Sequence, residues 1–175
     1  RIKGERKIYL SGRFDPIRQV WLDKESVLAN PEAIKAIINA DIILIGPGSL
    51  WTSIIPNLLI QDITKAIIKN KHAKKIFICN ISTERGETQN YSVQDHINKL
   101  VSYSHKKIID SVLVNSKVIK TSRTTHRLGE VNNITTSENI INGYKIIKAN
   151  LINPHAPLYH NSKKVAKIIW EICHE

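Results

Sequence analysis

Several residue types and patterns are rare or absent in this 175-residue sequence, and their absence excludes whole classes of protein. The two cysteines, Cys79 and Cys173, cannot build a disulfide framework, and neither lies in a CxxC pair. A structural zinc site is therefore excluded, and a reducing cytoplasm is the expected compartment. The longest apolar runs, such as residues 42–45, fall far short of the ~20 residues that a membrane span needs. We also expect no signal peptide, because no charged segment followed by an apolar one opens the sequence.

Methionine is missing altogether, and the first residue is Arg1. An intact gene product begins with methionine. We therefore expect residue 1 to lie inside a longer protein or to follow a processing site, so that any binding site found in these residues is incomplete.

Acidic residues are scarce relative to basic ones, 15 against 26, which gives a net charge of +11. Residues 101–175 carry 11 basic and 5 acidic side chains, about half of this excess. A basic surface attracts nucleic acid, an anionic membrane or a phosphorylated ligand, but it is also compatible with an ordinary solvated surface. Aromatic residues form only 6% of the chain and do not alternate with basic ones, as base stacking would need. We expect neither a nucleic-acid nor a membrane partner.

Strand-like and helix-like patterns alternate along the chain, which is typical of an α/β domain with a mostly parallel sheet. Continuous apolar runs at 41–45, 75–79 and 111–114 predict parallel strands buried on both faces. Further strands are predicted at residues 7–10, 17–22 and 144–149, and helices from Asn30, over 58–70, from a capping box at Ser92 and from a cap at Ser162. Residues 115–140 show no clear period. The length of 175 residues predicts one domain over residues 1–175, and the 42% hydrophobic residues are typical of a globular protein.

The first candidate site is the loop at residues 46–53, which follows the strand predicted at 41–45. Gly46 and Gly48 let the backbone turn sharply, and Ser49, Thr52 and Ser53 offer hydroxyl groups, so the loop suits a phosphate. An ordinary strand-to-helix turn would use the same residues. The dinucleotide fingerprint is incomplete because its third glycine position is a tryptophan, and no lysine follows the second glycine as in a P-loop.

The second candidate site is the loop at residues 80–96, which follows the strand predicted at 75–79. Asn80 is suited to orient a ligand, Glu87 and Asp95 to bind a metal ion or a hydroxyl group, and Tyr91 to stack on a ring. The competing interpretation for Asp95 is a helix cap, and for His96 a buried core histidine. Neither a Ser–His–Asp order nor an HExxH motif is present, so no metal site and no hydrolytic triad is predicted.

Both loops resemble signature segments of the CofD/YvcK-like family, and the resemblance covers residues 41–59 and 79–96 most closely. Residues 21–22 and 29–33 also fit the family's upstream segment. This family joins 2-phospho-L-lactate transferase with the bacterial gluconeogenesis factors, regulators of carbon metabolism and cell shape that bind uridine-diphosphate sugars. The likeness is strong over residues 17–101, fair to residue 114 and faint beyond.

The resemblance implies a Rossmann-like fold in three layers, with helices flanking the sheet. It also implies that this chain is the C-terminal part of a larger domain, of roughly 300 residues, whose glycine-rich nucleotide loop is absent from these residues. Matched residue by residue, it assigns ligand and phosphate binding to the two loops: Gly46, Gly48, Ser49, Thr52, Asn57, Asn80, Thr83, Gly86, Glu87, Thr88 and Tyr91.

The chain departs from the family pattern at three places, of which the first, Trp51 where family members usually have tyrosine, is a harmless exchange of aromatic residues. Family members commonly have Gln-Pro where Glu84-Arg85 stands, and the arginine in place of proline loosens the loop. Near the end of the chain, Tyr159-His160-Asn161 stands where regulators have Arg-His-Asp. The loss of that arginine removes a phosphate contact worth ~1.5–3 kcal/mol, for which Arg85 or a nearby lysine is a candidate replacement.

These observations favour a regulator that binds a UDP-sugar, such as UDP-N-acetylglucosamine, without catalysis and without a fixed cofactor. The alternative is a phospholactate transferase that moves a phosphate-linked group from a nucleotide diphosphate donor to a deazaflavin, with Mg²⁺ bridging phosphates and Glu87 or Asp95 as base or metal ligand. A second alternative is a scaffold whose basic C-terminal face binds an acidic partner. A homo-oligomer is compatible with each of these functions.

Overall fold

A five-stranded sheet forms the centre of the protein, whose computed structural model describes residues 2–12, 17–24, 26–118 and 131–174. The strands lie in the order β1-β2-β3-β5-β4, and β1, β2, β3 and β5 run parallel while β4 is antiparallel to β5. The strands are β1 (Ile42–Ile45), β2 (Lys74–Ile78), β3 (Ser111–Asn115), β4 (Ile140–Ile141) and β5 (Tyr144–Ala149), followed by a separate hairpin of β6 (Ile152–Asn153) and β7 (Ala156–His160). The predicted mostly parallel α/β sheet is confirmed.

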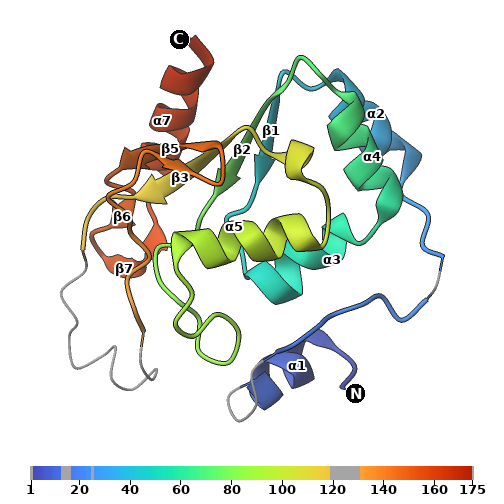
Figure 1. Cartoon of the computed structure of the whole chain (residues 1–175), viewed down its shortest axis with the longest axis horizontal. Helices are drawn as coiled ribbons and strands as arrows, with labels where there is room; N and C mark the ends of the chain where they lie inside the picture. Colours follow the sequence, from blue (N-terminus) through green and yellow to red (C-terminus); the bar gives the residue numbers. More distant parts are fainter. Residues whose placement is uncertain (1, 13–16, 25, 119–130, 175) are drawn as a thin grey trace.

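Helices cover both faces of this sheet (Figure 1). The helical segments are α1 (Glu5–Gly12), α2 (Pro31–Asn39), η1 (Leu50–Ile54), α3 (Ile55–Leu58), α4 (Gln61–Lys69), α5 (Val93–Ser102), η2 (Lys106–Ile108) and α7 (Ser162–His174). The helices α2, α3, α4 and α5 contribute to one hydrophobic cluster, and α7 packs with β6 on the opposite face. The three-layer prediction is therefore confirmed.

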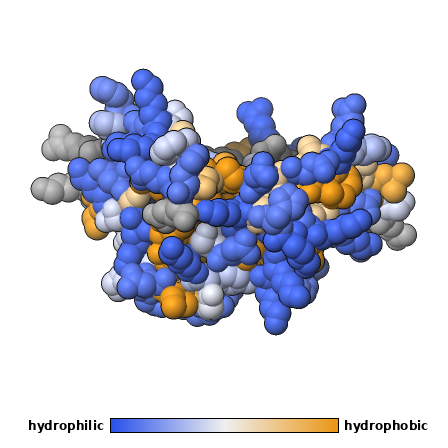
Figure 2. Space-filling model, turned by 90° about the horizontal axis from the view of Figure 1, so that it is seen from above, coloured by the Kyte–Doolittle hydropathy of each residue, from blue (hydrophilic) through white to orange (hydrophobic). Residues whose placement is uncertain are grey.

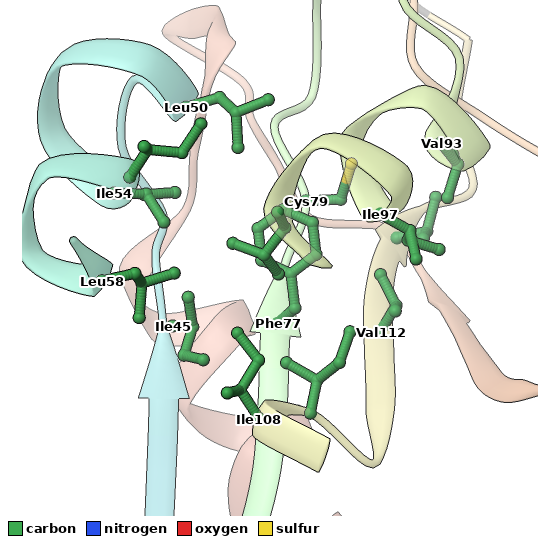
Figure 3. Close-up of a cluster of buried hydrophobic side chains, with 14 of the residues drawn as sticks. Ile45, Leu50, Ile54, Leu58, Phe77, Cys79, Val93, Ile97, Ile108 and Val112 are labelled. Atoms are coloured by element: carbon green, nitrogen blue, oxygen red, sulfur yellow. The ribbon is translucent and has the colours of Figure 1, made fainter. Parts of the chain in front are cut away.

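The larger hydrophobic cluster lies between the strands and the helices α3 and α5. Figure 3 shows the side chains of Leu58, Phe77 and Ile97 in this layer, and all three are at most 5% exposed. Burying one such side chain stabilises the fold by about 1.5–3 kcal/mol. On the opposite face, Ile78 and Val165 belong to a second, smaller cluster. The central strands thus bury side chains on both faces, as their continuous apolar sequences predict.

Two helix starts follow the sequence signals directly. The Asn30 side chain accepts a hydrogen bond of 2.9 Å from the Glu32 backbone N–H, so it caps α2. At α5, Ser92 and Asp95 form the predicted capping box, in which each side chain bonds the other residue's backbone N–H. Both caps satisfy donors that the first helical turn leaves without partners.

The two N-terminal strand predictions are wrong. Residues 7–10 lie in α1, and residues 17–22 form no strand ladder. Ile17 and Val20 pack instead against the larger cluster, and the Val20 backbone N–H donates to the Tyr103 hydroxyl at 3.0 Å. A strand needs a neighbouring strand to satisfy its backbone, and in the described ranges none lies beside this segment.

Three smaller predictions also need correction. In β1, Ile42 and Leu44 are 37% and 44% exposed, because this strand lies at the edge of the sheet and only one of its faces is covered. The helix predicted over 58–70 begins at Gln61, after the turns η1 and α3. Asn161, rather than Ser162, caps α7 by accepting a bond of 3.1 Å from the Lys164 backbone N–H.

The outer surface reflects the high content of charged residues. Figure 2 shows a face covered mostly by hydrophilic residues, with small separate hydrophobic patches. Across the described ranges, no helix combines the length and the apolar character that crossing a membrane would require.

Candidate ligand-binding site

A cavity of about 840 Å³ lies where β1 and β2 end, at the carboxyl edge of the sheet. Ligands of open α/β sheets bind at this edge. The lining combines three parts of the chain: the loop after β1, the loop after β2 and the end of β7, with one residue of α1 and one of the segment before β4. The lining residues are Arg6, Pro47, Gly48, Ser49, Thr52, Asn80, Ile81, Ser82, Thr83, Glu84, Arg85, Glu87, Val131, Leu158, Tyr159 and His160.

The first loop is joined to the second by a hydroxyl–carboxylate cluster of Ser49, Thr52 and Glu87. The Ser49 hydroxyl donates to Glu87 Oε2, and its oxygen accepts from the Thr52 backbone N–H at 3.2 Å. The Thr52 Oγ1 lies 2.7 Å from Ser49 Oγ and 3.2 Å from Glu87 Oε1. Both hydroxyl groups therefore direct their hydrogens within the cluster, and their lone pairs are better suited to a ligand hydroxyl than to a phosphate oxygen.

Gly46 begins the first loop in the left-handed region, with φ of +85°. A Cβ atom at this position would lie 3.0 Å from the Ile78 carbonyl oxygen in β2 and 3.3 Å from Ile54 Cδ1. Only glycine fits both the backbone conformation and this close approach. Gly46 does not line the cavity, but it directs the loop toward it.

The second loop is held by hydrogen bonds to its own backbone and to the segment before β4. The fully buried Thr88 hydroxyl accepts from the Glu84 backbone N–H at 2.9 Å. Thr83 and Asn132 exchange two hydrogen bonds of 2.9 Å, one through the Thr83 backbone N–H and one through its hydroxyl oxygen. The loop therefore has a fixed shape despite the arginine at position 85.

Two carboxyl groups face the cavity, Glu84 and Glu87. Glu87 is 6% exposed and accepts the hydrogen bonds described above. Burial, and secondly the negative charge of Glu87, raise the pKa of Glu84 to about 7. The Glu84 Oε2 atom is buried and has no hydrogen-bond partner among the described residues.

His160 closes another side of the cavity. Its Nε2 lies 3.2 Å from the Cys79 carbonyl oxygen, which fixes this nitrogen as the donor. Burial lowers the pKa of His160, partly offset by this hydrogen bond, so the ring is neutral at neutral pH. In the sequence, His160 aligns with the histidine of the family's Arg-His-Asp segment. This match is the sequence signal that points to a place for His160 in the site.

Six of the residues matched to the family's ligand site line the cavity: Gly48, Ser49, Thr52, Asn80, Thr83 and Glu87. Gly86 and Thr88 are buried behind it. Asn57 is exposed, and its side-chain amide donates to the Ser53 carbonyl at 2.7 Å. Tyr91 packs edge to face against His96, with ring centroids 5.5 Å apart, and Tyr91 is not in the cavity lining.

Asp95, the other candidate for base or metal ligand, also lies outside the cavity lining. Hydrogen bonds from the Ser92 side chain and backbone lower the pKa of Asp95, as expected for a capping carboxylate. Across the part of the chain that the structure describes, no three His, Cys, Asp or Glu side chains form a group that could hold a metal ion.

Sequence reasoning missed several lining residues, namely Arg6, Val131 and Leu158, and it gave Glu84 no role. These positions carry no motif of their own. Only the packing of α1, the segment before β4 and the β6–β7 hairpin around the two loops brings them to the site.

The fold and this cavity define an α/β protein with a polar cavity at the carboxyl edge of its sheet, the edge at which open α/β sheets bind their ligands. The family model described as 2-phospho-L-lactate transferase CofD matches residues 1–152, and the chain belongs to this family. A gluconeogenesis factor of Halalkalibacterium halodurans is 32% identical over 179 residues, covering 97% of this chain and 53% of the relative. A gluconeogenesis factor of Bacillus subtilis is 47% identical over 103 residues, covering 59% of this chain and 32% of the relative.

The crystal structure of a UPF0052 family protein from Bacillus halodurans has the same fold. It superposes with a TM-score of 0.84 at 30% identity, covering 97% of this chain and 55% of the solved chain. The chain therefore spans about a third to a half of the length of these relatives.

Proposed function

We propose that the protein is a regulator of the gluconeogenesis-factor type that binds a UDP-sugar in this cavity without turning it over, acting in the cytoplasm on carbon metabolism and cell shape. The observation that carries the proposal is the Ser49–Thr52–Glu87 cluster, which joins both family loops at one wall of the cavity. A volume of about 840 Å³ suits a ligand of this size.

The charges of the lining support a ligand with both phosphate and hydroxyl groups. Arg6 and Arg85 bring guanidinium groups to the cavity, and these suit a diphosphate. The Glu87 carboxyl oxygens are acceptors that suit ribose or sugar hydroxyls, and Asn80 offers both a donor and an acceptor. A ligand with only phosphate groups, or with only hydroxyl groups, would leave part of this lining without hydrogen-bond partners.

Calorimetric titration of UDP-N-acetylglucosamine tests the proposal, using the protein encoded by the whole reading frame that contains these residues. Saturable binding without consumption of the nucleotide sugar is the expected result. Ser49→Ala should weaken binding, and Ser53→Ala, a neighbouring exposed serine outside the lining, serves as the matched control. No heat of binding at ligand concentrations in the millimolar range would overturn the proposal.

A transferase is the second candidate, favoured by the two carboxyl groups that share the cavity. Mg²⁺ is commonly held by one or two carboxylates together with substrate phosphates, and Glu84 and Glu87 fit that role. Such an ion would neutralise charge on the transferred group. Product formation from a guanylyl-phospholactate donor and a deazaflavin acceptor, dependent on Mg²⁺ and lost in Glu87→Gln, would favour this candidate over the regulator.

A further inference from the structure

Glu84 is the one cavity-lining residue with a buried carboxyl oxygen that lacks a hydrogen-bond partner among the described residues. Its backbone N–H donates to the Thr88 hydroxyl at 2.9 Å, and the residue belongs to the cavity lining. A buried polar atom without a partner is unfavourable, so the Glu84 carboxyl group gains from a hydrogen bond with a ligand that enters the cavity.

The neighbouring charges determine whether Glu84 is protonated or ionised when an anionic ligand binds. Glu87 lies close enough for its negative charge to disfavour a second one, and it is anchored by Ser49 and Thr52. The other charged or titratable residues of the lining are Arg6, Arg85, Tyr159 and His160. A phosphate group adds negative charge beside Glu84, so its binding favours the protonated carboxyl group.

We propose that Glu84 binds the ligand as a neutral carboxylic acid that donates its hydrogen to an acceptor oxygen of the ligand's diphosphate, so that binding takes up one proton from solvent. This inference rests on the proposed UDP-sugar function and identifies Glu84 as a specificity residue for anionic ligands. The ionised form has no hydrogen to donate and repels the phosphate, whereas the neutral form both donates and removes the repulsion.

The expected consequence is a pH dependence with a defined sign. Glu84 titrates near pH 7 in the free protein, so it is protonated below that pH and ionised above it. Ligand affinity is therefore highest below pH 7, and the dissociation constant should rise about 30-fold between about pH 6 and pH 8.5. A sugar nucleotide diphosphate has no phosphate proton to lose in this range, and His160, whose pKa lies below its usual value, titrates at the acidic side.

Calorimetry with UDP-N-acetylglucosamine over this pH range, in buffers of different ionisation enthalpy, measures both affinity and proton uptake. The wild-type protein should take up protons at about pH 8 and lose affinity steeply above pH 7. Glu84→Gln keeps a neutral donor, so it should bind at pH 8.5 at least as well as at pH 6 and take up no proton. Glu138→Gln, an exposed position outside the lining, should behave as the wild type.

Two outcomes separate this inference from the function on which it rests. Binding whose pH dependence and proton uptake are the same in wild type and Glu84→Gln would overturn the role of Glu84 and leave the UDP-sugar function standing. Absence of binding at every pH, in wild type and both variants, would overturn the function and the inference together.

Discussion

The hydroxyl of Ser49 donates a hydrogen bond to the carboxylate of Glu87, 38 residues further along the chain. The register of the parallel strands brings these residues together, because Ile45 at the end of β1 pairs with Phe77 near the end of β2. The two loops that follow the strands therefore leave the sheet side by side. One serine thus caps η1 and positions an acidic group of the cavity.

Ser49→Ala should weaken ligand binding about tenfold and lower the free energy of unfolding by about 1 kcal/mol. The variant loses the bond to Glu87 and the cap on the Thr52 backbone N–H. Titration calorimetry and urea denaturation measure the two effects. Ser53→Ala keeps the same Cβ but removes an exposed hydroxyl, so it should change neither quantity; equal effects in the two variants would contradict a specific role for Ser49.

Gly46→Ala should lower the free energy of unfolding by about 2–4 kcal/mol, combining left-handed strain with a steric clash. The new Cβ would lie 3.0 Å from the Ile78 carbonyl oxygen. Gly143 has the same φ of +85° but nothing within 4 Å of an added Cβ, so Gly143→Ala isolates the strain and should cost about 1 kcal/mol. Thermal or urea unfolding checks the difference, and equal losses would show that the contact with β2 is unimportant.

Asn70→Ala should destabilise the protein by about 2–4 kcal/mol. Asn70 is 2% exposed, and its amide donates to the Ile37 and Ala40 carbonyls at 2.9 and 2.8 Å, while its oxygen accepts from the Ala73 backbone N–H at 2.8 Å. It therefore joins the end of α2 to the start of β2.

Asn39→Ala is the control for this change. Asn39 is exposed and makes one bond, to the Lys35 carbonyl at 2.9 Å, so its removal should cost less than about 0.5 kcal/mol. If urea denaturation gave the same midpoint for both variants, the buried amide would not be the link that we describe.

Glu84→Gln should stabilise the free protein at pH 8 and have little effect at pH 4. A carboxyl group whose pKa is raised from 4.5 to about 7 by folding is ionised in both states at pH 8, and its burial then opposes folding. The neutral amide avoids this cost, so the gain at pH 8 should be about 1–3 kcal/mol. Urea denaturation at both pH values measures it; a gain that did not depend on pH would contradict the raised pKa.

Asp95→Ala should lower stability at neutral pH by about 1 kcal/mol without changing ligand affinity, because its carboxylate caps α5 outside the cavity lining. Hydrogen bonds from Ser92 lower the pKa of Asp95, so its contribution is complete above the usual aspartate pKa and is lost as pH falls through the lowered value. The difference from wild type should therefore shrink in acid. A large loss of affinity would instead support the ligand role considered for this residue.

Local signals in the sequence were sufficient for the four parallel strands and for the starts of α2 and α5. The Ser92–Asp95 capping box and the Asn30 cap were predicted because both involve residues within a few positions of each other. Residues 7–10 were predicted incorrectly because four residues cannot distinguish a strand from a turn of helix by their pattern alone. The exposed face of β1 was missed because an apolar sequence does not reveal which strand lies at an edge.

The sequence by itself determined the alternation of strands and helices, the caps and the family to which the two loops belong, since each depends on neighbouring residues. Tertiary structure decided which polar groups share the cavity: it placed His160 and Glu84 there and left Asp95 and Asn57 outside its lining. It also decided the raised pKa of Glu84, because the burial that chiefly raises this pKa exists only in the folded protein.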